Sequence, residues 1–466
     1  MNKSKIIRLY ILLGVLVVAC IATFAISRHE EEKELIKNSD KIILTLDSDS
    51  VTALSWEYDD TTLSFHKDET WLYDDDEAFP VDDEKIAALL EQFQEFGVSF
   101  IIEEVTDYSQ YGLDEPTCTI SITAGEEIYE IELGAYSTMD SKRYVSIGDG
   151  NVYLVTDDPM ENYEVEISDL IKHDEIPDLS DATGIQFAGT ENYEIIYEEE
   201  STNTYCADDV YFTDNKPLDT STVGDYLDTI DSLSLTDYVS YNATEEELQA
   251  FGLDTPDLTV TVDYPVENED GELITKTFVL NIGRNQEELA EALESEDEDA
   301  EYNVTAYARV GDSQIVYQIT SLNYTNLTAV AYDDLRHKEV LTASFDDIYQ
   351  IDITLEDTDY SLTTTEDEDG TTTWHYTEDE ELNISGLKSA INALEADSFT
   401  EEEATQKEEI SMTVYLNNEN YPEIHIAFYR YDGENCLAVV DGQSVSFVSR
   451  SYVVDLIEAV NSIVLN

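Results

Sequence analysis

Histidine is the side chain best suited to proton transfer and metal binding near neutral pH, and the chain carries six histidines. They are His29, His66, His173, His337, His375 and His425. None belongs to an H-E-x-x-H sequence, and no two stand at the helical spacing that places two ligands on one metal ion. The sequence has no G-x-S-x-G nucleophile elbow and no P-loop. These patterns predict no catalytic, cofactor-binding or metal-binding residue, so we do not expect an enzyme.

The four cysteines, Cys20, Cys118, Cys206 and Cys436, also lack a chemical signature. No two form a C-x-x-C pair, so the sequence indicates neither a zinc site nor a thioredoxin-type redox site. Cys20 lies in an apolar N-terminal run, and the other three fall in separate repeats described below. We therefore interpret these three as small buried hydrophobic residues rather than as a disulfide framework.

Acidic loops are the remaining candidates for ion binding. In the loop that ends at Gly370, an EF-hand register would put Thr365 at position one and Tyr376 at position twelve, where oxygen ligands are needed. That mismatch favours an acidic hairpin turn. The run 74–77 is likewise interpreted as a solvated loop ahead of a helix. Paired carboxylates cannot indicate a glycosidase in a chain with 106 acidic residues.

The overall charge excludes one class of partner. With 106 acidic and 22 basic residues the formal net charge is −84, whereas nucleic-acid binding needs clustered cations. Cation or basic-partner binding and a solvated, self-repelling surface both stay open as reasons for the acidity. The hydrophobic fraction of 42% and the 31 tyrosines argue against disorder. Tyrosines that alternate along strands, such as Tyr193 and Tyr197, are best explained by sheet packing.

Residues 6–26 form a nearly unbroken apolar stretch, about the length that spans a bilayer as a helix. Lys3, Lys5 and Arg8 precede or begin this stretch, and the first acid is Glu30. The positive-inside rule predicts a single-pass protein of the cell membrane with its body outside the cytoplasm. An alternative is a lipoprotein in which Cys20 is lipidated, since 17–20 resemble a lipobox. A cleaved signal peptide is the less favoured alternative.

The body contains internal repeats. The sequence aromatic-Gly-Leu-Asp-x-Pro occurs at 111–116 and again at 251–256, each time followed by an alternating strand pattern. Glycine permits a positive φ and proline favours extension, so the motif predicts a turn into a sheet. Three β-hairpins are predicted around Gly148-Asp149, Gly311-Asp312 and Asp441-Gly442.

Each repeat also contains one predicted amphipathic helix with apolar residues at i, i+3, i+4 and i+7. These helices hold Ile86, Leu89, Leu90 and Phe93; Val223, Tyr226, Leu227 and Ile230; and Leu387, Ala390, Ile391 and Leu394. Asp82, Asp219 and Asn383 are the predicted N-caps. Short strands on both sides predict an α+β fold, in which one helix covers an antiparallel sheet. We expect a cytoplasmic tip and transmembrane anchor at 1–28, a stalk at 29–44, and α+β repeats at 45–175, 176–340 and 341–466.

The pattern resembles a bacterial family known as domain of unknown function 4340. The features that carry this resemblance are the strand at 71–73, the helix led by Asp82, the Gly-Leu-Asp-x-Pro turn, and Trp374 at a place similar to Trp71. The resemblance covers about 45–330 and, more weakly, the remainder, where Glu408-Glu409-Ile410 replaces the turn. It implies a membrane-anchored, extracytoplasmic protein, often encoded beside components of gliding-motility-type ABC transporters. It implies no catalytic residue.

Two functions are therefore expected. The leading hypothesis is a non-catalytic binding or scaffold accessory of an envelope or ABC-transporter-associated membrane protein complex, without a cofactor. The alternative is an ectodomain that binds or hydrolyses cell-wall or nutrient glycans. A glycan enzyme should have, in one repeat only, a cleft with aromatic walls and two carboxyl groups of perturbed pKa.

Overall fold

The computed structural model describes residues 41–103, 105–297, 299–366, 372–377 and 380–464. The predicted anchor at 1–28 and the stalk as far as residue 40 lie outside these ranges. Within them, no helix combines the length and the apolar character needed to cross a bilayer. The chain divides into two compact units, 1–173 and 174–466, and each is described by itself.

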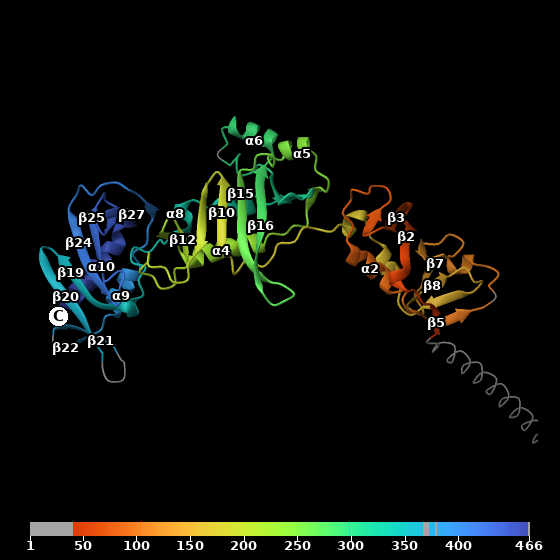
Figure 1. The fold of residues 1–466 in the computed structure, drawn as a ribbon, viewed down its shortest axis with the longest axis horizontal. Helices are drawn as coiled ribbons and strands as arrows, with labels where there is room; N and C mark the ends of the chain where they lie inside the picture. The colour runs from red at the N-terminus through yellow and green to blue at the C-terminus, as the bar shows by residue number, and fades with distance from the viewer. Residues whose placement is uncertain (1–40, 104, 298, 367–371, 378–379, 465–466) are drawn as a thin grey trace, which may run out of the picture. The chain divides into compact units, whose positions relative to one another are not determined.

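The first unit is built on a nine-stranded antiparallel sheet in the order β1-β5-β9-β8-β7-β6-β2-β3-β4 (Figure 1). Its strands are β1 (Lys41–Leu44), β2 (Val51–Tyr58), β3 (Thr61–Lys67), β4 (Trp71–Tyr73), β5 (Phe96–Ile102), β6 (Cys118–Ala124), β7 (Glu127–Ser137), β8 (Lys142–Ser146) and β9 (Val152–Val155). Helix α2 (Asp83–Glu91) follows β4, and the short α3 (Met160–Tyr163) follows β9. Leu54 and Trp56 of β2 are buried while Glu57 is exposed, as expected for a sheet with one solvated face.

The second unit holds two more nine-stranded antiparallel sheets. One contains β10 (Gly184–Gly189), β11 (Tyr193–Tyr197), β12 (Tyr211–Thr213), β13 (Lys216–Pro217), β14 (Tyr238–Ser240), β15 (Leu258–Glu267), β16 (Leu273–Arg284), β17 (Ala306–Val310) and β18 (Val316–Ile319). Its helices are α4 (Thr220–Asp231), α5 (Glu245–Ala250), α6 (Gln286–Leu293), α7 (Ser321–Thr328) and α8 (Tyr332–Leu335).

The other sheet of this unit contains β19 (Ile348–Leu355), β20 (Thr358–Glu366), β21 (Thr372–Thr377), β22 (Glu380–Leu382), β23 (Ser398–Phe399), β24 (Glu408–Leu416), β25 (Glu423–Arg430), β26 (Asn435–Val440) and β27 (Gln443–Ser449). Helix α9 (Ser385–Asn392) precedes β23, and α10 (Arg450–Val464) follows β27.

Eight strands follow the same order in all three sheets. The order β5-β9-β8-β7-β6-β2-β3-β4 in the first sheet corresponds to β14-β18-β17-β16-β15-β10-β11-β12 and to β23-β27-β26-β25-β24-β19-β20-β21 in the others. The predicted hairpins therefore lie at equivalent places, between β8 and β9, β17 and β18, and β26 and β27. The prediction of repeated antiparallel sheets with equivalent hairpins is confirmed, while the predicted domain boundaries stay predictions.

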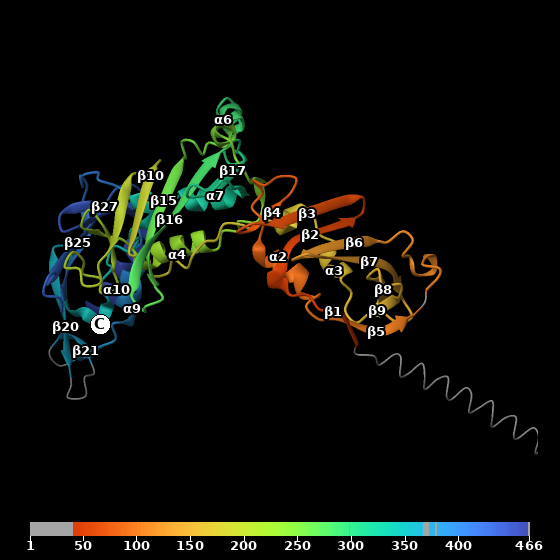
Figure 2. The same cartoon turned by 45° about the vertical axis from the view of Figure 1, so that its right-hand side comes forward.

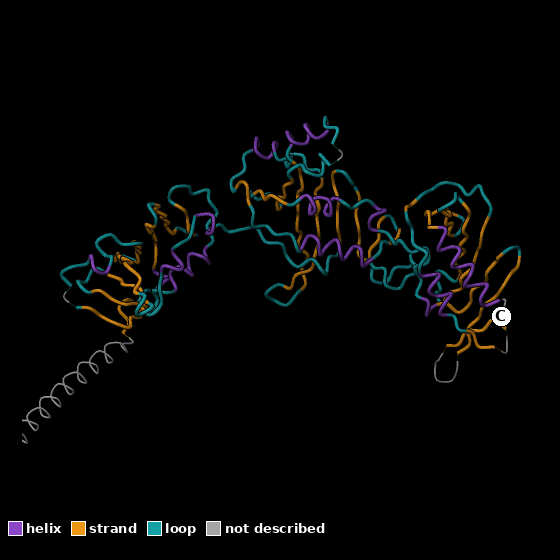
Figure 3. The backbone as a smooth tube through the Cα atoms, turned by 180° about the vertical axis from the view of Figure 1, so that it is seen from behind, coloured by secondary structure: helices purple, strands orange, loops and turns teal. Residues whose placement is uncertain are grey.

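More than one helix packs on each sheet, which corrects the prediction of a single covering helix. Figures 2 and 3 show α4 and α7 on the same face of the sheet that contains β15 and β16. The Tyr226 hydroxyl of α4 donates to the Leu327 carbonyl of α7 at 3.2 Å, and Tyr163 after β9 donates to the Leu89 carbonyl of α2 at 3.0 Å. Strands lie about 4.8 Å apart and a helix is about 10 Å across, so one helix cannot cover nine strands.

The predicted helices form, with one correction at a cap. Asp82 and Asp219 cap α2 and α4 through their side chains. In the third repeat the N-cap is Ile384 rather than Asn383, although the Asn383 side chain still accepts a hydrogen bond from the Ser385 backbone. Helix α10 was not predicted, although its buried residues Val453, Leu456 and Val460 show the spacing i, i+3, i+7. Helices α3, α5, α6, α7 and α8 were not predicted either.

The repeated Gly-Leu-Asp-x-Pro turn depends on its glycine. Gly112 and Gly252 have φ values of 66° and 69°, in the left-handed region. A Cβ on Gly112 would lie 2.9 Å from the Ala135 backbone nitrogen, and one on Gly252 would lie 2.7 Å from the Arg284 carbonyl oxygen. The turn therefore needs glycine both for its backbone angle and for its close approach to the neighbouring strand.

Candidate functional site

The connection between β11 and β12, residues 198–210, is the best candidate for a functional site. β11 ends at Tyr197 and β12 begins at Tyr211, which leaves thirteen residues in this loop. Within it, the Thr204 hydroxyl accepts a hydrogen bond from the Cys206 backbone at 3.0 Å and donates one to Asp209 at 2.6 Å. These short-range bonds are typical of Thr and Asp in turns, and they fold the loop back on itself.

Asp209 brings a carboxylate into the interior, where it is only 3% exposed. One carboxylate oxygen, Oδ2, accepts from Thr204 and the other, Oδ1, lies 2.7 Å from His337 Nε2. A buried charge is tolerated when it is both paired and hydrogen-bonded, and both conditions hold here.

His337 comes from the segment that follows α8. Its Nδ1 lies 3.7 Å from Glu339 Oε2, on the side of the ring opposite to Asp209. Burial alone would lower the pKa of His337, but the hydrogen bond to Asp209 and the charges of Asp209, Asp219 and Glu339 outweigh it, and the pKa is raised. When His337 is protonated, it forms an ion pair with the Asp209 carboxylate.

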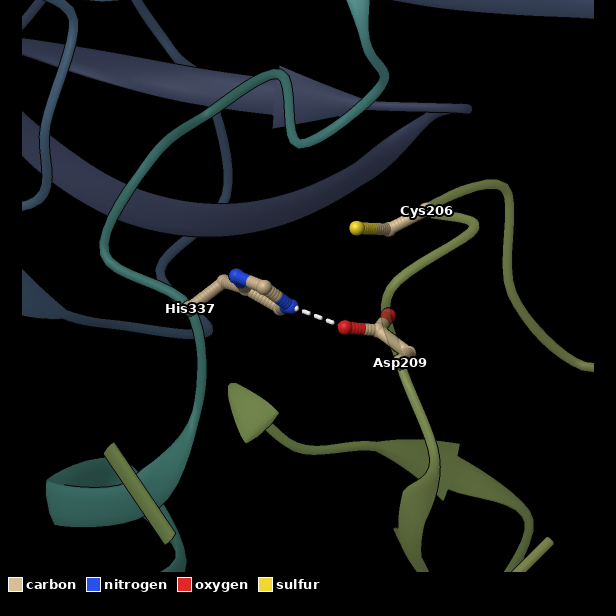
Figure 4. A group of neighbouring side chains, drawn as sticks. All are labelled: Cys206, Asp209 and His337. Atoms are coloured by element: carbon tan, nitrogen blue, oxygen red, sulfur yellow. Dashed lines mark hydrogen bonds and ion pairs between the residues drawn. The ribbon is translucent and has the colours of Figure 1, made fainter. Parts of the chain in front are cut away.

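Cys206 completes the group, and Figure 4 shows the three side chains converging from two segments of the chain. The thiol is half-buried, and burial, with the nearby Asp209 carboxylate adding to it, raises its pKa to about 11. A nucleophilic cysteine needs a lowered pKa, so the arrangement does not favour a Cys–His hydrolase.

A cavity of about 280 Å³ lies beside the pair. His337, Glu339 and Thr204 form part of its wall, and other wall residues are Tyr205 and Tyr421. The Tyr205 and Tyr421 rings lie 5.7 Å apart at 72°, an edge-to-face contact. Tyr205 also packs against the hydrophobic core of the third sheet. Loop 198–210 thus belongs to the second sheet but contributes to the packing of the third.

The cavity wall also carries two cations. The Arg336 guanidinium lies 4.1 Å from the centroid of Phe399 and 5.0 Å from that of Tyr332. Lys216 Nζ lies 5.3 Å from the centroid of the same Tyr332 ring. Aromatic faces attract cations, so these contacts hold positive charge at the cavity in a chain that is otherwise strongly acidic.

Comparison with known proteins gives one family. The sequence model described as "Domain of unknown function (DUF4340)" matches residues 71–207 and 210–412, well over half of the chain. The chain belongs to this family. Both DUF4340 matches begin at the same place in the fold, since Trp71 starts β4 and residue 210 directly precedes the equivalent strand β12. No curated protein and no solved structure matches.

The sequence of the DUF4340 chain does not indicate this group. It predicts no catalytic, cofactor or metal residue, a prediction that the structure does not test, and it indicates a buried hydrophobic residue at Cys206. Asp209 and His337 are 128 residues apart, so no local motif can indicate their contact. The unusual length of the β11–β12 connection was the signal available, because its equivalent between β3 and β4 has three residues.

Proposed function

We propose that this DUF4340 protein is a membrane-anchored, extracytoplasmic binding component of an envelope or ABC-transporter-associated complex, built from tandem α+β repeats behind an N-terminal transmembrane helix. The apolar run at 6–26 with its flanking cations supports the anchor and the orientation. The envelope and transporter setting is what the resemblance to the DUF4340 family implies. The observation that carries the binding role is an arm on the second sheet.

The arm is the outer part of the β15–β16 hairpin, which runs past its neighbouring strands (Figure 1). The ladder with β10 ends at Asp263 and the ladder with β17 ends at Leu280. Beyond these points β15 and β16 continue to pair only with each other, from Tyr264 opposite Lys276 to Glu267 opposite Leu273. The β16 edge of the arm could therefore be extended by a partner through β-strand addition, whereas Pro265 removes a backbone donor from the β15 edge.

The side chains of the arm are also suited to a protein partner. Val262, Tyr264 and Val266 alternate along β15 and so lie on one face, which continues the buried face of the sheet outward. Ile274, opposite Val266, is 42% exposed, and Leu273 is 76% exposed. Apolar side chains on an exposed two-stranded arm are typical of a protein interaction element.

Photo-crosslinking in intact cells tests this function. A photoreactive residue replaces Ile274, and the matched control replaces Ile128, an exposed residue (72%) at the equivalent hairpin of the first sheet. We expect a discrete crosslink to a membrane protein from position 274 and none from position 128. Equal labelling at both positions would refute a specific role for the arm. A crosslink to glycan instead of protein would support the alternative, an ectodomain that binds or hydrolyses glycans.

A further inference from the structure

Loop 198–210 and the segment after α8 bring together three different metal-binding groups. Cys206 offers a sulfur, Asp209 a carboxylate oxygen and His337 an imidazole nitrogen, and these donor atoms all lie within 4.8 Å of one another. Zn²⁺ is bound tetrahedrally by this set of ligand types, at about 2.0–2.3 Å from each donor. Two donors of one tetrahedral ion are about 3–4 Å apart by that geometry. Seating an ion would therefore require Asp209 Oδ1 and His337 Nε2, 2.7 Å apart, to separate by up to about 1 Å.

The surroundings orient two of the three ligands as an outer shell orients a metal site. Thr204 donates to one oxygen of Asp209 and leaves the other directed at His337. On the far side of the imidazole, Glu339 lies 3.7 Å from Nδ1. A carboxylate that accepts a hydrogen bond from a ligating histidine fixes the ring and its tautomer, and Glu339 would have to move roughly 0.7 Å closer to do so.

The local charge also favours a divalent cation. Asp219, His337 and Glu339 have ligand atoms within 4.8 Å of one another, so three carboxylates, with Asp209, surround a single imidazole. The negative charge of these three carboxylates attracts a divalent cation. The adjoining cavity, whose wall includes His337 and Thr204, gives room for a fourth ligand such as water.

We infer that Cys206, Asp209 and His337 form a binding site for a divalent transition-metal cation of the zinc class. The site lies on the second sheet, apart from the β15–β16 arm, and it does not depend on the proposed binding function. Its structural role is to join loop 198–210 to the segment that leads into the third sheet.

Cobalt(II) titration of the full-length protein, purified in detergent under reducing, oxygen-free conditions after chelator treatment, tests the site. Co²⁺ occupies zinc sites and reports a thiolate ligand by charge-transfer absorption in the near ultraviolet. We expect this absorption to saturate at one Co²⁺ per chain and to disappear when Zn²⁺ is added. Cys206→Ser should abolish the absorption, and His337→Gln should weaken Co²⁺ binding at least tenfold.

Matched controls locate the ligands. Cys436→Ser removes another free cysteine, and His66→Gln removes a histidine whose Nδ1 lies 2.6 Å from Asp74 on the first sheet. Both variants should bind Co²⁺ as the unmodified chain does. Absence of the near-ultraviolet absorption, or its persistence in Cys206→Ser, would overturn the inference. Loss of binding in Glu339→Gln with full retention in Cys206→Ser would also overturn it, because the ion would then sit among Asp219, His337 and Glu339.

Discussion

The equivalent connections β3–β4 and β11–β12 differ in what they do for the fold. The first has three residues, and the second has thirteen. Each lies near a His–Asp pair of almost the same length, 2.6 Å for His66–Asp74 and 2.7 Å for His337–Asp209. Both side chains of the first pair are about 40% exposed, whereas in the second pair the Asp209 side chain is 1% exposed and the His337 side chain is 18% exposed. The two pairs therefore differ in how deeply their side chains are buried and not in their His–Asp distance.

The difference shows how an inserted loop can join repeats. The short β3–β4 connection turns back at once and leaves its ion pair in water, where screening makes such pairs weak. The long β11–β12 loop carries Asp209 inward to His337 and Tyr205 onto the core of the third sheet. This packing gives a physical reason why the second and third sheets form one compact unit while the first sheet forms a unit of its own.

Removal of the buried Asp209 carboxylate should have the larger effect of the two pairs. Asp209→Ala should lower the free energy of unfolding of the second unit by about 3 kcal/mol, at the lower end of the cost of breaking a buried pair, because His337 can lose its proton. Asp74→Ala should change the first unit little, since that pair is exposed. Chemical denaturation followed by hydrogen exchange, read separately in the two units with a chelator present, measures both. Equal effects of the two substitutions would show that burial does not distinguish the pairs.

Shortening Tyr205 tests whether the loop joins the sheets. Tyr205→Ala removes an edge-to-face contact with Tyr421 and apolar packing on the third core, which should cost about 2 kcal/mol for a partly buried ring. Hydrogen exchange should then rise around 336–344, between the second and third sheets. Tyr197→Ala is the control, because Tyr197 is 41% exposed and lies on β11 of the same hairpin. Unchanged protection at 336–344 in Tyr205→Ala would contradict the joining role.

The features that could be predicted from the sequence are those encoded over short distances. Alternating strands, the caps Asp82 and Asp219, and the hairpin at Asp441-Gly442 depend on a few neighbouring residues. In that hairpin both Asp441 and Gly442 adopt positive φ, 49° and 79°, as a type I′ turn requires. The sheet order then follows from repetition of one unit.

The candidate site could not be predicted in the same way. It needs a loop from one repeat to meet the segment after α8, and the pairing of Asp209 with His337 is decided by tertiary packing. Cys206 lies three residues before Asp209 and Glu339 two residues after His337, but neither spacing is a metal-binding motif by itself. Residues 198–210 are polar and resemble a solvated connection, although Tyr205 packs on the next core. The N-terminal anchor lies outside the described residues, so its prediction stays open.

Salt should have a weaker effect on stability, and comparing different salts separates the general acidity of the chain from a specific ion site. Sodium chloride should stabilise both units gradually, because the Debye length falls to about 10 Å at 0.1 M and repulsion among the acids is screened. A gain of about 1 kcal/mol in the free energy of unfolding would raise each melting temperature by about 2–4 °C.

Sub-millimolar calcium adds almost no ionic strength and should change the melting temperature of neither unit, since the acidic turns lack the spacing of a calcium loop. Zn²⁺ at the same concentration should raise only the transition of the second unit, because an ion that binds the native state stabilises it by mass action. A large calcium response that sodium could not reproduce would instead place ion binding in the acidic turns, and the two units would then differ less than their hairpin loops suggest.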